Sequence, residues 1–237
     1  IGGINYKNPN VKNITADITN PKIFKRLQNF KFEYVFHLAA QSAGETSYDD
    51  PSYDILTNSY GTYLVSKFCL ENKVKKLIYT STVAVYGNHV GSVNESSHIK
   101  PDSIYGASKF TGELFVRQLL DKSKVKYTIF RVFNVFGPGE NLNFLKKGIV
   151  SIYLGYVWRK ESLIVKGSLN RYRDLVYVSD AIDALILAMS KKKSDNETYN
   201  LASGKKIIIK DLINKIKFIF NLDKKFQVKV KDSTPGD

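Results

Sequence analysis

The chain has 237 residues, of which 43% are hydrophobic and 13% aromatic. This composition is typical of a globular protein and excludes disorder as its main state, and no apolar run approaches the roughly 18 residues that a membrane-spanning helix needs. The formal net charge of +14 leaves three classes of partner open: nucleic acid, a membrane surface or a small anionic ligand.

The positive charges are scattered along the chain. The only run of three lysines, Lys191–Lys193, follows a helical pattern, where cations stabilise the helix C-terminus. We therefore interpret the charge as a solvated surface and expect no nucleic-acid or membrane partner, whereas a small anionic substrate fits the charge equally well. Cys69 stands alone, which excludes a disulfide framework and a cysteine zinc site and indicates the cytoplasm. The three histidines have no metal-ligand spacing, so we expect no metal.

Strand-like and helix-like segments alternate along the first 140 residues. Residues 34–38, 77–80 and 128–132 are almost entirely apolar, which predicts buried parallel strands. Helices are expected at residues 21–27, behind an Asn20 cap and a first-turn proline, and at residues 53–72 and 105–120. This alternation predicts an α/β fold, an open parallel sheet with helices on both faces.

The pattern loosens after residue 140, where the second half is expected to form a lobe packed on the first. Ser179 is expected to cap a helix. The further elements predicted here are helices at 149–157, 181–189 and 210–220, and strands at 163–165, 175–178, 199–201 and 226–230.

Small and polar residues follow three of the predicted strands, at residues 37–44, 81–87 and 133–139. Open α/β sheets bind ligands at the carboxyl ends of their strands, so we expect the functional site there.

Tyr105 and Lys109 place a phenol and an ammonium on one face at the start of a helix. A tyrosine with a pKa near 10 is a poor base, but a neighbouring cation stabilises the phenolate and lowers that pKa, so such a tyrosine can transfer a hydroxyl proton. The spacing alone arises by chance in a chain rich in tyrosine and lysine. Its significance depends on the motifs around it.

Five further motifs accompany this pair: His37-Leu38-Ala39-Ala40-Gln41, Thr57–Thr62, Tyr79–Gly87, Arg131–Gly139 and Arg173–Asp180. In their order and spacing, the six segments resemble the extended short-chain dehydrogenase/reductase superfamily, and in particular its nucleotide-sugar epimerases and dehydratases, over residues 17–237. The resemblance implies a Rossmann-type doubly wound sheet, NAD as cofactor and a nucleotide-diphosphate sugar as substrate.

By this resemblance, Tyr105 is the proton-transferring base, Lys109 lowers its pKa and holds the nicotinamide ribose, and Thr82 binds the sugar hydroxyl being oxidised. Asn134 and Arg173 would also bind substrate, Arg173 at the diphosphate, because guanidinium and phosphate pair strongly. The residues implied for the cofactor are Asp17, Ile18, Leu38, Ala39, Ala40, Gln41, Asn58, Ser81, Tyr105, Lys109 and Phe133. The resemblance also implies a homodimer through helices 53–72 and 105–120.

The family's Gly-x-x-Gly-x-x-Gly turn, which admits a pyrophosphate at a helix N-terminus, is not formed by any of the 15 glycines. Gly2 and Gly3 come closest. We therefore expect residues 1–140 to be an NAD-binding domain lacking its first βαβ segment, residues 141–237 to be a substrate-binding lobe that is also incomplete, and the natural protein to be longer.

The preferred reading is an NAD-dependent epimerase of a UDP-hexose at C4. Dehydratases of the family carry an Asp-Glu pair directly after the catalytic threonine, where this chain has Val83 and Ala84, so dehydration is disfavoured. A dehydratase, reductase or decarboxylase on the same scaffold, or a non-catalytic basic binding protein, remains as an alternative. His37 is interpreted as a structural histidine, and Asp180 as a helix-start residue.

Overall fold

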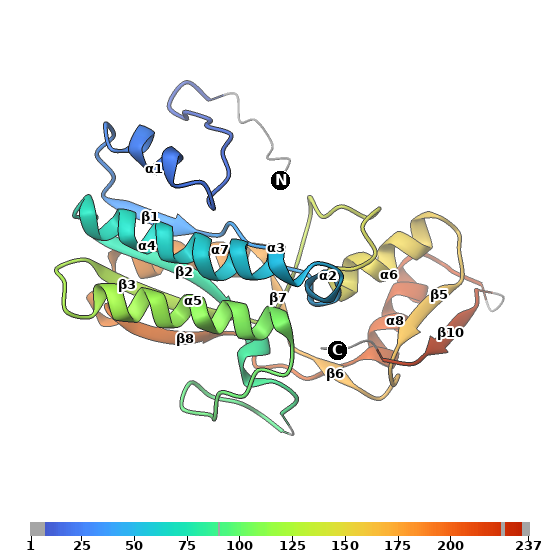
Figure 1. The fold of residues 1–237 in the computed structure, drawn as a ribbon. Helices are drawn as coiled ribbons and strands as arrows, with labels where there is room; N and C mark the ends of the chain where they lie inside the picture. The colour runs from blue at the N-terminus through green and yellow to red at the C-terminus, as the bar shows by residue number, and fades with distance from the viewer. Residues whose placement is uncertain (1–7, 90, 224–225, 234–237) are drawn as a thin grey trace.

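The structure is a computed structural model that describes residues 8–89, 91–223 and 226–233. Its centre is a parallel sheet in the order β1-β2-β3-β8 (Figure 1). The strands are β1 (Tyr34–His37), β2 (Lys76–Thr82), β3 (Lys126–Val132) and β8 (Glu197–Leu201). The predicted α/β class with an open parallel sheet is confirmed. Gly2 and Gly3, the glycines that come closest to the family's Gly-rich turn, lie outside the described residues.

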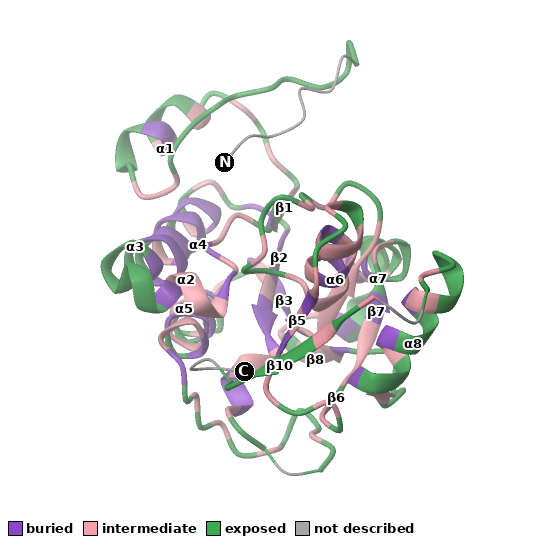
Figure 2. Cartoon of the chain, turned by 90° about the vertical axis from the view of Figure 1, so that its right-hand side faces the viewer, coloured by how far each residue is buried: buried purple, intermediate pink, exposed green. Residues whose placement is uncertain are grey.

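The strands of this sheet are buried on both faces because their apolar side chains alternate between two cores. Leu77, Tyr79 and Ile129 pack on one face, whereas Ile78 and Phe130 pack on the other. Burial on both faces explains why these strands are nearly continuous apolar runs in the sequence. Figure 2 shows the buried residues concentrated on the strands and on the inner sides of the helices.

Helices α4 (Gly61–Glu71) and α5 (Ile104–Leu120) cover the first face of the sheet, and α7 (Val178–Ser190) covers the second (Figure 1). The helix expected at 53–72 is three consecutive segments: α3 (Pro51–Ile55), the π-helical turn η1 (Leu56–Tyr60) and α4. Turns of π-helix are rare and occur frequently at functional sites.

Side-chain caps explain where two of the helices begin. Helix α1 (Pro21–Leu27) starts as predicted, with the Asn20 side chain accepting from the backbone N–H of Lys22. Ser103 caps α5 by accepting from the N–H of Gly106 at 3.0 Å. The expected Ser179 cap is wrong: the N-cap lies two residues earlier, at Tyr177, so α7 begins at Val178 and has no side-chain cap.

A second group of elements has its own apolar core. Helices α6 (Ile149–Trp158) and α8 (Ile209–Ile219) enclose Tyr153, Leu163 and Ile213 against the parallel pair β5 (Leu163–Lys166) and β10 (Val228–Lys231). Two short pairs connect the groups: β4 (Asn134–Phe136) with β7 (Leu175–Tyr177), and β6 (Tyr172–Arg173) with β9 (Ile207–Ile208). The remaining elements are α2 (Gly44–Asp49) and the 3-10 turns η2 (Val83–Tyr86) and η3 (Lys192–Ser194).

The chain crosses between the two groups after residue 140. Helix α7 and strand β8 both follow α6 and β5 in sequence, yet they belong to the central sheet and its second face. Within the described residues, no helix is long and apolar enough to cross a membrane.

Candidate active site

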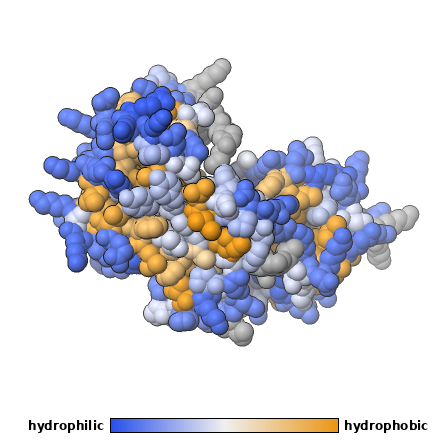
Figure 3. All heavy atoms as spheres, viewed as in Figure 1, coloured by the Kyte–Doolittle hydropathy of each residue, from blue (hydrophilic) through white to orange (hydrophobic). Residues whose placement is uncertain are grey.

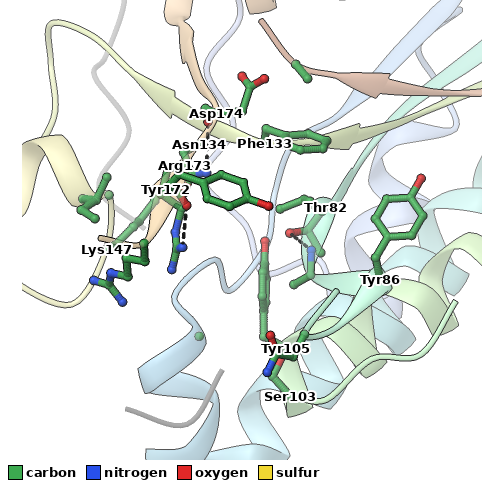
Figure 4. A pocket seen from close by; sticks show the side chains of 18 of the residues that line it. Thr82, Tyr86, Ser103, Tyr105, Phe133, Asn134, Lys147, Tyr172, Arg173 and Asp174 are labelled. Atoms are coloured by element: carbon green, nitrogen blue, oxygen red, sulfur yellow. Dashed lines mark hydrogen bonds between the residues drawn. The ribbon is translucent and has the colours of Figure 1, made fainter. Parts of the chain in front are cut away.

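A cavity of about 780 Å³ opens where β2 and β3 end and where the short parallel pair β4/β7 begins. Figure 4 shows side chains converging on it from both groups of elements. Five of the residues predicted for the site line the cavity: Thr82, Tyr105, Phe133, Asn134 and Arg173. The structure thus brings together residues that are as far apart in sequence as β2 and β6.

Tyr105 lies in the first turn of α5, and its hydroxyl points toward Thr82 at the end of β2 (Figure 4). The Thr82 hydroxyl also accepts from the N–H of Ala84 at 3.2 Å, which fixes it at the start of η2. Burial raises the pKa of Tyr105 to about 12, and the hydrogen bond with Thr82 opposes this rise. The net shift is upward because desolvation of the phenolate outweighs the favourable contact, and the lowering by Lys109 that the resemblance implies stays a prediction.

Lys109 lies one turn further along α5, with only 2% of its surface exposed. Its ammonium sits 4.5 Å from the centre of the Tyr79 ring, and the Tyr79 hydroxyl donates to the Lys109 carbonyl oxygen at 3.2 Å. Burial lowers the pKa of Lys109 to about 7, against the opposing effects of the Glu113 and Asp54 carboxylates. Lys109 therefore lies behind Tyr105 rather than in the cavity wall.

A buried ion pair lies beneath this part of α5. Glu113, one turn after Lys109, pairs with Arg131 of β3 at 2.8 Å, and both side chains are at most 5% exposed. The Ser81 hydroxyl donates to Glu113 at 2.5 Å, so the hydroxyl of this predicted cofactor residue is engaged in the core. The sequence analysis missed Glu113, although its spacing from Lys109 places both on one helix face.

The loop after β1 is held by a network of amide hydrogen bonds. The Asn58 amide accepts from the N–H of Gln41 and donates to the carbonyl of Gln41, both at 3.0 Å. The Gln41 side chain turns inward to the buried Asp54 carboxylate at 2.8 Å. Asn58 and Gln41 thus shape the loop, while Leu38 at its start keeps 54% of its surface exposed beside the small Ala39. Asp54 was missed by the sequence analysis.

Asp17 and Ile18 lie away from the cavity. Asp17 is exposed, and its carboxylate accepts from the N–H and the hydroxyl of Thr19, both at 2.9 Å. Ile18 lies against Gly61 at the start of α4, where an added Cβ would approach to within 2.8 Å.

The wall of the cavity opposite Tyr105 is strongly basic. Asn134 lies here, and its amide donates to the carbonyl of Asp174 at 3.1 Å, while Arg173 donates to the carbonyl of Tyr172 at 3.0 Å. Seven cationic side chains line the cavity: Lys146, Lys147, Lys166, Arg171, Arg173, Lys205 and Lys206. An excess of positive charge in a cleft attracts anionic ligands. No cluster of three His, Cys, Asp or Glu that could hold a metal ion occurs in the described part of the chain.

The model of the NAD dependent epimerase/dehydratase family matches residues 3–202. A putative UDP-glucose 4-epimerase of Methanocaldococcus jannaschii is 32% identical over 220 residues, which cover 91% of this chain and 70% of that protein. The human dTDP-D-glucose 4,6-dehydratase is 28% identical over 88% of this chain and 60% of its own length. A crystal structure of UDP-glucose 4-epimerase from Thermotoga maritima with UDP-glucose is 31% identical, with a TM-score of 0.87 over 94% of this chain and 72% of that one.

The chain belongs to the NAD-dependent epimerase/dehydratase family, whose model covers most of its length. The fold is the Rossmann-type fold of its relatives, and the family's cofactor is NAD. Leu38, which directly follows β1, keeps 54% of its surface exposed, so an open apolar surface fits such a cofactor where this strand ends.

His37, at the end of β1, yields a prediction about stability. It is buried and shares a 2.9 Å hydrogen bond with Thr62, as expected for a structural histidine. Burial, assisted by the charge of Lys109, lowers its pKa from 6.5 to about 3. As the pH falls from about 6.5 towards 3, His37 binds a proton in the unfolded chain but stays neutral in the folded chain. The free energy of unfolding therefore decreases over this window. Its contribution is on the order of a few kcal/mol.

In His37→Gln, this histidine's part of the pH dependence disappears. Urea unfolding at a series of pH values should show a smaller fall of the unfolding free energy between neutral pH and pH 4 than in the parent chain. His98→Gln, which alters an exposed loop histidine, serves as the control and should keep the parent slope. Equal slopes in His37→Gln and the parent would contradict the assignment.

Proposed function

We propose that the chain carries the active site of an NAD-dependent nucleotide-diphosphate-sugar epimerase acting on a UDP-hexose at C4. One observation carries this proposal: the Thr82 and Tyr105 hydroxyls face a cavity of about 780 Å³ whose opposite wall holds Arg173 and other cations. A proton-transferring pair on one side and a diphosphate-binding surface on the other match the two ends of a sugar nucleotide.

NAD, when bound, supplies the hydride acceptor and donor for the sugar carbon. The chain's own residues manage the proton and the orientation. Tyr105 exchanges a proton with the sugar hydroxyl at its phenol oxygen, and Thr82 holds that hydroxyl by a hydrogen bond. Lys109, one helical turn away, supplies the positive charge that favours the phenolate when the proton leaves. Asn134 orients the sugar, and Arg173 pairs with the diphosphate.

The two residues after Thr82 favour epimerisation over dehydration. Val83 and Ala84 form the start of η2, directly beside the proposed reacting hydroxyls. Elimination of water requires an additional acid and base, and these apolar side chains cannot carry protons. The chain has dehydratase and reductase relatives at 28% identity, so this local difference supports the choice within the family.

Replacing the proposed base tests the mechanism. Tyr105→Phe removes only the phenol oxygen, so we expect interconversion of UDP-glucose and UDP-galactose with NAD to fall by about 10²-fold or more, while UDP-glucose binding measured by calorimetry is retained. Tyr177→Phe, which removes an exposed phenol outside the cavity, is the matched control and should keep full turnover. Full turnover in Tyr105→Phe would rule out its role as the base.

Arg173 provides a second test that needs no turnover. Arg173→Gln keeps a polar side chain but removes the charge, so we expect the affinity for UDP in calorimetry to fall about tenfold or more. Lys122→Gln removes one exposed charge at the far end of α5 and should bind UDP as the parent does. If both variants bind UDP equally well, the diphosphate does not lie at Arg173.

We further propose that two copies pair through the exposed face of α3, η1 and α5. Figure 3 shows orange patches on the side of the molecule that Figure 1 faces. The large hydrophobic side chains exposed on these segments are Tyr53, Ile55, Leu56, Tyr60 and Leu114. A patch of this kind on two adjacent helical segments is typical of a protein interface.

A charge placed in this face should separate the copies. Leu56 is 51% exposed in the single chain, so Leu56→Lys should fold normally but shift the sedimenting mass from twice 26.9 kDa to 26.9 kDa. Ile186→Lys, an equally exposed position on α7, is the control and should leave the mass unchanged. A parent chain that sediments at 26.9 kDa would contradict the proposed dimer.

A further inference from the structure

Asp54 is a fully buried carboxylate that belongs to none of the sequence motifs and does not line the cavity. It lies in α3 with 0% exposure, one turn before Asn58 of the π-helical turn η1. Removing an ionised carboxylate from water is costly unless hydrogen bonds and a countercharge compensate it. The groups around Asp54 therefore indicate why it is there.

Two side-chain amides donate to Asp54, and backbone bonds fix the orientation of both. The Gln41 amide oxygen accepts from the N–H of Ala43, so its nitrogen faces Asp54 at 2.8 Å. The Asn58 amide oxygen accepts from the N–H of Gln41, so its nitrogen faces Asp54 at 3.3 Å. Amide nitrogens can only donate, and the Asp54 Oδ2 atom is the acceptor for both.

Ser108 connects Asp54 to the helix that carries the proposed base. Its hydroxyl contacts the Asp54 carboxylate and lies 3.1 Å from the carbonyl oxygen of Tyr105. The same hydroxyl accepts from the Asn58 amide at 3.1 Å. Asp54 thus joins three segments that are far apart in sequence: the loop after β1, the η1 turn and the first turn of α5.

Asp54 also acts on Lys109 through its charge. None of the ion pairs formed among the described residues includes Asp54, and its electrostatic effect on Lys109 favours the charged ammonium. Burial raises the pKa of Asp54, while Ser108, Asn58, Gln41 and the charge of Lys109 oppose this rise. The titratable and charged groups around Lys109 come from five elements: His37 on β1, Asp54 on α3, Tyr79 on β2, Tyr105 and Glu113 on α5, and Arg131 on β3 through Glu113.

We propose that Asp54 is a positioning residue of the active site: its buried carboxylate fixes the first turn of α5 through Ser108, fixes the loop after β1 through Gln41 and Asn58, and balances the charge of Lys109. This inference rests on the proposed function for the roles of Tyr105 and Lys109. The balance of charge and the hydrogen-bonded tie are separate properties, and each can be measured without substrate or cofactor.

The charge balance is tested by titrating Lys109 directly. In the whole chain labelled with 13C at the lysine Cε, Lys109 should titrate near pH 7, well below the reference value of about 10.4 for a lysine side chain in a model peptide. Loss of that signal in Lys109→Arg assigns it. In Asp54→Asn, which is isosteric but uncharged, we expect the midpoint to fall by about one pH unit. An unchanged midpoint overturns the proposed charge balance.

Two further variants separate charge from positioning. Ser108→Ala removes the hydroxyl that links the Asp54 carboxylate to α5, so amide hydrogen exchange in the first turn of α5 should become faster. Asp183→Asn removes an exposed carboxylate on α7 and should change neither measurement. Exchange in Ser108→Ala at the parent rate overturns the positioning role.

A second uncharged variant covers the case in which Asp54→Asn fails to fold, as judged by circular dichroism. Asp54→Ser has a smaller, uncharged side chain with a hydroxyl that can accept a hydrogen bond. Because the negative charge is lost, this variant should lower the Lys109 midpoint in the same way. Because both readouts are independent of turnover, a chain that titrates as expected but converts no sugar contradicts only the proposed function. A chain that converts sugar with an unshifted Lys109 midpoint contradicts only the role of Asp54.

Discussion

The buried ion pair between Glu113 and Arg131 sets the position of α5 on the central sheet. An unpaired charge at this depth would be costly, and breaking a buried pair typically destabilises a protein by about 3–5 kcal/mol. Glu113 also accepts from Ser81, so one carboxylate joins α5 to both β2 and β3. Since Thr82 follows Ser81 directly, the same contact that places α5 also brings Tyr105 opposite Thr82. The proposed chemistry therefore depends on a core interaction.

The active-site helix is held from two sides by carboxylates of different kinds. Glu113 has a cation within ion-pair distance, whereas Asp54 is compensated by amides and a hydroxyl. The negative charges of both carboxylates raise the pKa of Lys109 and so favour its charged form. Replacing either acid would therefore change the charge of Lys109, but only Asp54 also shapes the loop after β1. This difference explains why we assign positioning of the loop to Asp54 alone.

The sequence predicted the fold and the cavity residues for a physical reason. Buried parallel strands are apolar on both faces, and their carboxyl ends meet at one edge, so Thr82, Phe133 and Asn134 could be placed together from the strand pattern and the family resemblance. The sequence pattern did not identify Asp54 and Glu113 as site residues, because a buried charged residue on a helix cannot be told from an exposed one by sequence alone. The predicted Ser179 cap was wrong because the helix begins two residues closer to the N-terminus than a cap at Ser179 would place it.

The expected effect of Lys109 on Tyr105 shows most clearly what sequence spacing leaves out. Spacing identifies a neighbouring cation but not the burial of both groups, and burial disfavours a phenolate and an ammonium alike. The pKa values therefore move apart, to about 12 for Tyr105 and about 7 for Lys109. Divergent pKa values in adjacent groups are typical of acid–base pairs, and here Lys109 is the member whose charge nearby carboxylates can set.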